Sequence, residues 1–329
     1  MIKRIEISGI NGAQSLKADF ASGGFAWLYG APASGKTTLF SALQIVQRIA
    51  RGTVTVQQIF SSLPYVASFP GQSRIMIDFA NRTEDFRYEV VVSKAVPFGT
   101  LSITHEALHR VHELDWTRQR QLFVREANGV SVMGFNGVPV QYSIDPSAFA
   151  LATTSDPGSG LLTSARALLG GMLLVKPEVN LMRDDVVLPG WMEGAFSDLA
   201  SQLAQAFQRM PAIYSHIEFF CQKMVRGFQG IVIRDVPSYG RYLYVQKGGR
   251  EFSLSMLSES EKRLLSLAFA YALGVLYVES VCVWDDFLLG IPESLADQCA
   301  GLISQAYAGG QFVALTSRRN VSGPSVLLQ

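Results

Sequence analysis

One short segment near the N-terminus constrains the fold of this chain more than any other feature. Residues 30–37 read Gly-Ala-Pro-Ala-Ser-Gly-Lys-Thr and match the pattern Gly-x-x-x-x-Gly-Lys-Ser/Thr of a phosphate-binding loop. An apolar run over residues 24–30 predicts a buried strand directly before it, and a helix is expected from Lys36 to about Ile49. Phosphate binding requires this order of strand, loop and helix, so the pattern is expected to be functional and not a glycine-rich turn without a ligand.

Each residue type in this segment has a role in binding phosphate. Glycines let the backbone fold around an anion with its N–H groups pointing inward, and the following helix directs its positive end at the same place. Lys36 is expected to reach the β- and γ-phosphates of ATP, and Thr37 is expected to coordinate Mg²⁺. The predicted nucleotide-binding residues of this segment are Gly30, Ala31, Pro32, Ala33, Ser34, Gly35, Lys36, Thr37 and Thr38.

Two consecutive aspartates form a second candidate group. The apolar residues 281–284 (Val-Cys-Val-Trp) predict a buried strand that ends at Asp285 and Asp286. Asp285 is predicted to hold Mg²⁺, directly or through water, and Asp286 to polarise the attacking water, with Lys36 as the other catalytic residue. The alternative is a structural pair of turn or capping aspartates.

The segment before a long apolar helix is a third candidate. Residues 257–263 read Leu-Ser-Glu-Ser-Glu-Lys-Arg, so Ser258 and Glu261 have the spacing of a capping box. A helix N-terminus with serine hydroxyl groups is also an anion site. Ser258 and Ser260 are therefore candidates for contacting the γ-phosphate of a nucleotide bound to a second subunit.

The composition excludes several classes of protein. Of the 329 residues 48% are hydrophobic and 17% charged, which indicates a compact core, and the net charge of +1 provides no overall attraction to nucleic acid or to an acidic membrane. Three cysteines are too few for a disulfide framework, and the N-terminus lacks the apolar core of a signal peptide, so a cytoplasmic location is expected. The apolar stretch 264–284 is interpreted as a buried helix followed by a core strand, not as a membrane span.

Hydrophobic periodicity predicts an α/β chain that contains an antiparallel sheet. Between residues 73 and 132 the apolar residues recur with period two, and residues 128–129 (Asn-Gly) are typical of a hairpin turn. The alternating apolar residues are Ile75, Ile77, Phe79, Phe86, Tyr88, Val90, Val92, Leu122 and Val124.

Later segments predict a helical region and then alternating helices and strands. We expect residues 1–150 with 258–329 to form a P-loop ATPase core with the antiparallel sheet, and residues 160–256 a helical lobe with a small sheet attached. A helical stripe is predicted at Trp191, Ala195, Phe196, Leu199, Leu203 and Phe207, and helices at 213–225 and from about Ser258. A strand is predicted at 280–285, a helix at 293–306 and a strand at 312–315.

The order of these motifs resembles the ABC-type ATPases of the AAA and P-loop NTPase class, and more narrowly the RecF, structural-maintenance-of-chromosomes (SMC) and overcoming-lysogenization-defect (OLD) branch. The resemblance covers nearly the whole chain and implies an ABC-ATPase-like head with a mixed core sheet, an antiparallel β subdomain and a helical lobe. In it Lys36 and Thr37 match the Walker A motif, Asp285 the Walker B aspartate, Ser258 the signature serine, and residues 287–292 the D-loop.

The resemblance also implies partners and an activity. Heads of this family sandwich two ATP molecules, each signature serine touching the nucleotide of the other head, so a homodimer that hydrolyses ATP with Mg²⁺ is expected. Such a head would be the motor or switch subunit of a DNA-maintenance, DNA-repair or anti-phage defence system, with an effector protein subunit as a further partner. DNA is an open partner class that the net charge does not favour, and no membrane partner is expected.

Three departures from the family pattern favour an alternative. Asp286 stands where the family usually has glutamate, Ser260 replaces the signature glycine, and residues 316–318 (Thr-Ser-Arg) stand where a switch histidine is expected. These differences imply slow hydrolysis, or hydrolysis completed by a partner. The alternative is a nucleotide-dependent scaffold that hardly turns ATP over and regulates an effector; Gln141 is a candidate for the Q-loop glutamine.

A competing pattern lies at residues 105–109 (His-Glu-Ala-Leu-His). On a helix, H-E-x-x-H puts two zinc ligands on one face with Glu106 as general base, and His112 or Glu126 would be the third ligand. On a strand the two histidines would be about 13 Å apart at about 3.3 Å per residue, too far to share a metal. Because the segment lies between period-two strands, a zinc metallopeptidase is the minor alternative.

Overall fold

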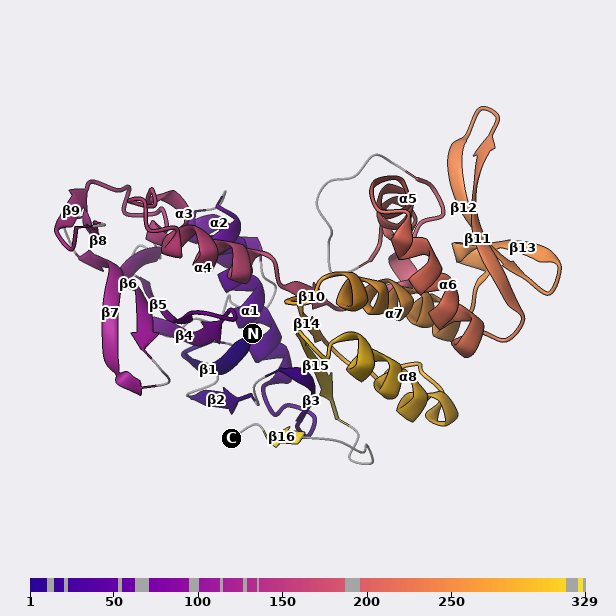
Figure 1. Ribbon diagram of the computed structural model, residues 1–329, viewed down its shortest axis with the longest axis horizontal. Helices are drawn as coiled ribbons and strands as arrows, with labels where there is room; N and C mark the ends of the chain where they lie inside the picture. The colour runs from indigo at the N-terminus through magenta and orange to yellow at the C-terminus, as the bar shows by residue number, and fades with distance from the viewer. Residues whose placement is uncertain are drawn as a thin grey trace. The chain divides into compact units, whose positions relative to one another are not determined.

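The computed structural model of the chain describes residues 1–10, 15–20, 23–52, 55–62, 71–94, 101–112, 115–126, 129–134, 136–186, 196–317 and 325–327 (Figure 1). The chain divides into two compact units, residues 1–22 with 28–172 and 326–329, and residues 23–27 with 173–325. The division falls within two short strands, β3 (Gly24–Tyr29) and β16 (Ser325–Leu327). The two units are defined by contacts between residues and not by function. The division into an ATPase core and a helical lobe expected from the sequence therefore stays a prediction.

The first unit is built on an eight-stranded antiparallel sheet in the order β2-β1-β4-β5-β6-β7-β8-β9. Its helices α1, α2 and α3 contact β1 and β6, and α4 packs against α1. The strands are β1 (Ile2–Ser8), β2 (Leu16–Asp19), β4 (Gln72–Ala80), β5 (Asp85–Lys94), β6 (Leu101–His112), β7 (Asp115–Glu126), β8 (Gly129–Met133) and β9 (Pro139–Tyr142). The helices are α1 (Lys36–Arg51), α2 (Val56–Ser62), α3 (Ala150–Thr153) and α4 (Leu161–Gly170).

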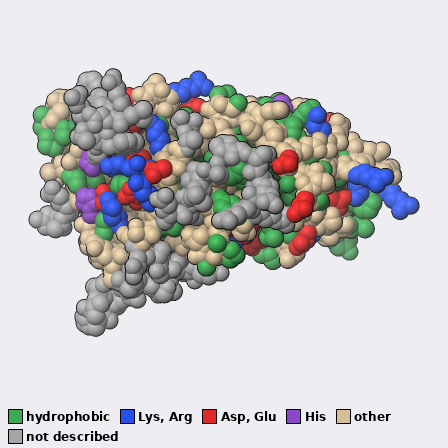
Figure 2. Space-filling model, turned by 90° about the horizontal axis from the view of Figure 1, so that it is seen from below, with side chains coloured by type: hydrophobic (Ala, Val, Ile, Leu, Met, Phe, Trp, Pro, Cys, Tyr) green, Lys and Arg blue, Asp and Glu red, His purple; other side chains and the backbone are tan. Residues whose placement is uncertain are grey.

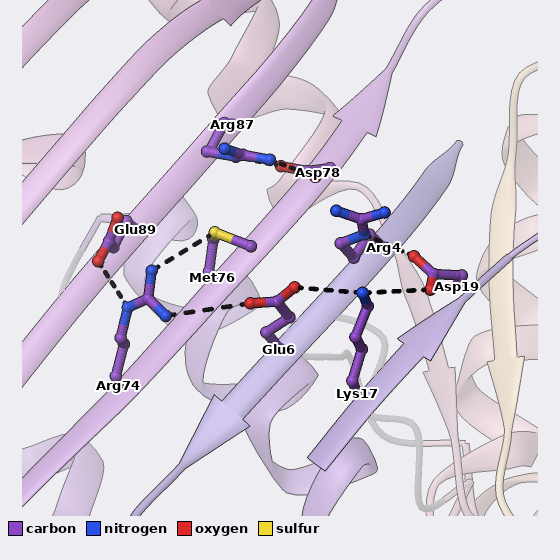
Figure 3. Close-up of polar contacts among 9 residues, drawn as sticks. All are labelled: Arg4, Glu6, Lys17, Asp19, Arg74, Met76, Asp78, Arg87 and Glu89. Carbon is purple, nitrogen blue, oxygen red and sulfur yellow. Dashed lines mark hydrogen bonds and ion pairs between the residues drawn. The ribbon is translucent and has the colours of Figure 1, made fainter. Parts of the chain in front are cut away.

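The two faces of this sheet have opposite character. The apolar residues of β4 and β5 pair across the strands, Ile75 with Val90 and Ile77 with Tyr88, and all four are buried. The opposite face carries four basic and four acidic side chains of β1, β2, β4 and β5 in ion pairs, as Figure 3 shows: Arg4, Glu6, Lys17, Asp19, Arg74, Asp78, Arg87 and Glu89. This alternation is the reason for the period-two pattern, and the formal charges of these eight side chains cancel. Basic and acidic side chains are also intermixed on the surface view of Figure 2.

The second unit contains the five-stranded sheet β10-β14-β15-β3-β16 and a three-stranded sheet β11-β12-β13. β10, β14 and β15 run parallel. The Gly24 N–H at the start of β3 donates to the Gly310 carbonyl just before β15. The further strands are β10 (Leu173–Val175), β11 (Phe228–Val236), β12 (Gly240–Lys247), β13 (Arg250–Ser253), β14 (Val281–Trp284) and β15 (Gln311–Thr316). The helices are α5 (Leu199–Arg209), α6 (Ala212–Met224), α7 (Glu259–Leu276) and α8 (Glu293–Ala306), with single 3₁₀ turns at Val179–Leu181 and Leu254–Met256.

Helix α7 is the central helix of this unit and packs against α6 and α8. Its glycine, Gly274, lies against the ring of Tyr307, which is fully buried and donates its hydroxyl to the Ala270 carbonyl at 3.0 Å. β14 is a strand separate from α7, as expected. Among the described residues no helix is long and apolar enough to cross a bilayer.

Most predicted elements are present in the predicted order. The helix predicted at 293–306 matches α8, and the strands predicted at 280–285 and 312–315 match β14 and β15 within a residue or two. The helical stripe continues into α5, although its residues Trp191 and Ala195 lie outside the described residues, as does Asn128 of the predicted hairpin turn.

Candidate functional site

The glycine-rich loop follows β3 and ends at the first residue of α1. Gly35 has a φ of 93° and Ala33 a φ of 65°, so two positions of the loop have left-handed backbone. The φ of Gly35 favours glycine, and a side-chain carbon there would also lie 2.7 Å from the Leu16 Cδ1 atom. The Ser34 N–H donates to the Ala31 carbonyl at 3.1 Å, which closes the turn.

The side chain of Lys36 folds back into this loop. Its Nζ donates to the Gly30 carbonyl at 2.5 Å and to the Ala31 carbonyl at 2.8 Å, and it lies 3.4 Å from the Ser34 hydroxyl. Only 8% of Lys36 is exposed. An ammonium group is thereby held inside the loop, as a phosphate-binding lysine requires.

The start of α1 has no side-chain cap. Its cap residue is Gly35, which has no side chain to accept the first N–H groups, and its first turn carries no acidic residue. In a 16-residue helix these N–H groups lie at the positive end of the dipole. Thr37 is exposed in this turn, whereas Thr38 is buried.

The two aspartates lie in the second unit, at the carboxyl end of β14. Asp285 is 2% exposed, and its N–H donates to the Val175 carbonyl at the end of β10. Burial raises the pKa of Asp285, and the ammonium of Lys176, whose Nζ lies 3.1 Å from Oδ2, opposes that rise. Asp286 is half-buried and has a φ of 52°.

One carboxylate oxygen of Asp285 lacks a well-aligned hydrogen-bond donor among the described residues. Within the described part of the chain no group donates a well-aligned hydrogen bond to the Asp285 Oδ2, although it is buried. A buried carboxylate oxygen without a donor is a suitable ligand for Mg²⁺, which prefers oxygen. The residues present therefore fit the predicted metal.

The signature segment forms the predicted capping box. The Glu261 N–H donates to the Ser258 hydroxyl at 3.3 Å, and the Ser258 N–H donates to the Glu261 carboxylate at 3.0 Å. Ser258 is exposed at the start of α7. The Ser260 hydroxyl instead donates to the Gly290 carbonyl, so it links the start of α7 to the turn that follows Asp286.

The H-E-x-x-H residues lie on a strand, not on a helix. They belong to β6, and Glu106 is fully buried as the acceptor for the Ala150 N–H at 2.6 Å, the Leu151 N–H at 2.8 Å and the Tyr88 hydroxyl at 2.9 Å. Glu106 therefore holds the start of α3. No cluster of three or more potential metal-binding side chains occurs among the residues that the structure describes. A zinc metallopeptidase needs these residues on a helix. They lie on a strand, as the period-two pattern favours.

Two residues of functional interest were missed at the sequence level. Lys176 contacts Asp285 because β10 and β14 are neighbours, and Glu106 acts as a helix cap from a distant strand. The only local signal for Lys176 is its place directly after the apolar residues 173–175. Within the first unit the structure brings Lys36 together with the loop, and within the second it brings Asp285 together with Lys176.

The fold is similar to that of SMC head domains. The Smc head bound to the C-winged helix domain of ScpA is 16% identical, covers 96% of this chain and 90% of that chain, and has a TM-score of 0.54. The SMC head domain from Thermotoga maritima and the Smc head with an extended coiled coil bound to the C-terminal domain of ScpA from Pyrococcus furiosus are each 15% identical. Each covers 96% of this chain and 89% of its own, with TM-scores of 0.47 and 0.48.

The fold assignment rests on the first of these structures, whose TM-score exceeds 0.5. No protein-family model matches the sequence, and no curated protein matches it. The chain therefore has a mixed α/β fold with an antiparallel sheet similar to an SMC head. The predicted likeness to SMC heads is confirmed for the fold, and the RecF and OLD branches stay predictions.

Proposed function

We propose that this chain is an ABC-type ATPase head that binds and hydrolyses ATP with Mg²⁺. The observation that carries the proposal is the loop of residues 30–35, in which the Lys36 ammonium lies at the uncapped start of α1. A buried cation and a helix N-terminus at one loop form an anion site of the kind that holds the phosphates of a nucleotide. The fold of an SMC head supports the same assignment.

The remaining roles follow from the chemistry of the side chains. Thr37 and Asp285 would hold the metal ion, which neutralises charge on the phosphates. Asp286 would orient the attacking water and accept its proton, and Lys36 would bind the β- and γ-phosphates. The exposed Ser258 would contact the nucleotide of a second copy, which makes the protein a homodimer closed by ATP.

We further propose that the head serves DNA maintenance or defence in the cytoplasm, with a protein partner. The support for a partner is that the similar Smc head with a TM-score of 0.54 is bound to the C-winged helix domain of ScpA. Binding of DNA itself would appear as an affinity that falls steeply with salt.

A nucleotide-dependent scaffold with little turnover is the second candidate. It is favoured by the short Asp286 side chain on left-handed backbone and by the Ser260 hydroxyl, which bonds to the Gly290 carbonyl of its own chain. Both features reduce the groups available to assist hydrolysis.

Titration with a fluorescent ATP analogue tests the binding site. Lys36→Ala is expected to weaken binding at least tenfold, a loss of about 1.4 kcal/mol. The matched control is Lys17→Ala, which removes an exposed lysine of the same unit and should bind as the wild type does. Equal affinity of wild type and Lys36→Ala would refute nucleotide binding by this loop.

The rate of ATP hydrolysis distinguishes the ATPase from the scaffold, and the molecular mass with nucleotide bound tests the dimer. If the wild-type hydrolysis rate equals that of Lys36→Ala while ATP still binds to the wild type, only the scaffold is left. Sedimentation of Asp286→Asn with ATP and Mg²⁺ should show a dimer. A monomer with nucleotide bound would exclude the two-head arrangement.

A further inference from the structure

Lys176 and Asp285 occupy equivalent places on neighbouring strands. β10 and β14 run parallel with Val175 opposite Trp284, so the next residue of each strand emerges at the same edge. The Asp285 N–H donates to the Val175 carbonyl at 2.8 Å, which fixes this register. The Lys176 Nζ is thereby held 3.1 Å from the Asp285 Oδ2.

The two side chains differ in exposure. The Asp285 side chain is 3% exposed and the Lys176 side chain 46%, so the lysine covers a buried carboxylate from the solvent side. Burying an ionised carboxylate is costly without a cation beside it. Lys176 supplies that cation. The Asp285 Oδ2 receives no well-aligned hydrogen bond in the described part of the chain, so the lysine balances the charge of the carboxylate without a well-aligned hydrogen bond to this oxygen.

We propose that Lys176 is a resident counter-ion that occupies the metal-binding oxygen of Asp285 and must leave before a divalent cation can bind there. The proposal rests on the proposed function, in which Asp285 is a metal ligand. An ammonium and Mg²⁺ in contact with the same oxygen repel each other, so the two cations compete for it. The long, half-exposed lysine side chain can turn into solvent, so Lys176 sets the concentration of metal that the site requires.

The test measures Mn²⁺ binding to the nucleotide-free protein from the EPR signal of free Mn²⁺. Lys176→Met keeps the length of the side chain and removes its charge, so Mn²⁺ is expected to bind roughly three- to tenfold more tightly. Lys176→Arg keeps the charge and should bind as the wild type does. Lys223→Met removes an exposed lysine of α6 in the same unit and is the matched control, which should also be unchanged.

A second measurement follows the thermal midpoint of each nucleotide-free variant with increasing MgCl₂. Because binding to the folded state stabilises it by mass action, Lys176→Met should show the larger rise with Mg²⁺. This holds even if loss of the counter-ion lowers its midpoint without metal.

The failure of this inference differs from the failure of the proposed function. If Asp285→Asn abolishes Mn²⁺ binding but Lys176→Met binds Mn²⁺ as the wild type does, the counter-ion role is wrong and the metal ligand stands. If Asp285→Asn leaves Mn²⁺ binding unchanged in both the wild-type and the Lys176→Met backgrounds, Asp285 is not a metal ligand, and both proposals fail for this residue.

Discussion

Gly274→Ala is predicted to destabilise the second unit, although alanine is the better helix former. The added carbon would lie 2.5 Å from Cδ2 and 2.8 Å from Cζ of the Tyr307 ring, and closer still to Cε2. Carbon atoms in contact prefer about 3.5–4.0 Å, so the ring would have to withdraw by about 1 Å.

The surroundings of Tyr307 make that movement costly in free energy. The ring is fully buried, stands edge-on to Phe312 with centroids 5.2 Å apart, and donates its hydroxyl to the Ala270 carbonyl. Overpacking of this kind costs about 1–3 kcal/mol, and loss of the hydrogen bond adds about 1 kcal/mol. Replacing a helical glycine returns about 1 kcal/mol, so the net loss is about 1–3 kcal/mol.

Urea unfolding followed by circular dichroism measures the effect. The matched control is Gly301→Ala in α8, where nothing lies within 4 Å of the added carbon, and a gain of about 0.5–1 kcal/mol is expected. In a Tyr307→Ala background the penalty of Gly274→Ala should disappear, because the two sites are coupled. A Gly274→Ala variant as stable as Gly301→Ala would refute the packing argument.

Three other predictions concern the first turn of α7 and the sheet of the first unit. Ser258→Ala removes the side-chain cap of α7 and should lower the free energy of unfolding by about 1 kcal/mol, whereas Ser258→Thr should lose little of it; equal losses in urea would contradict the capping role. Glu106→Gln puts an amide donor among the N–H groups that Glu106 accepts, so a loss of about 1–3 kcal/mol is expected, and an unchanged urea midpoint would contradict it. Burial lowers the pKa of His109, so the unfolded chain binds more protons just below about pH 6.5. Stability should therefore fall as the pH drops from 7 towards 5, and His109→Gln should flatten this dependence of the thermal midpoint.

The order of elements could be predicted because it depends on local periodicity. β4 and β5 show the reason, since their inward apolar residues are buried and their outward residues form ion pairs. In β7 the prediction was less accurate: Leu122 is buried as expected, but Val124 is only half-buried, and Phe123 between them is fully buried. A register shift between Leu108 and His109 on the neighbouring strand shows that pairing irregularities, which no alternation reveals, also affect this part of the sheet.

The candidate site also contains residues that the sequence predicted and residues that it could not predict. The phosphate loop was predicted because all of its groups lie in eight consecutive residues, and Ser258 with Glu261 because a capping box is also local. Lys176 could not be predicted as a partner of Asp285, because their contact depends on which strands are neighbours in the sheet. The capping role of Glu106 could not be predicted either, because the strand that the period-two pattern favoured does not show which helix start the side chain contacts.

Under the proposed function, the glycine at the start of α1 would couple the stability of this helix to what it binds. Serine, threonine, asparagine and aspartate are preferred at this position because their side chains accept the first N–H groups, and Gly35 has no such side chain. A bound phosphate would act as the absent cap, so ligand at a hundredfold excess over its Kd would stabilise the protein by about 2.7 kcal/mol. Resistance to proteolysis would then rise and fall with the nucleotide supply of the cell.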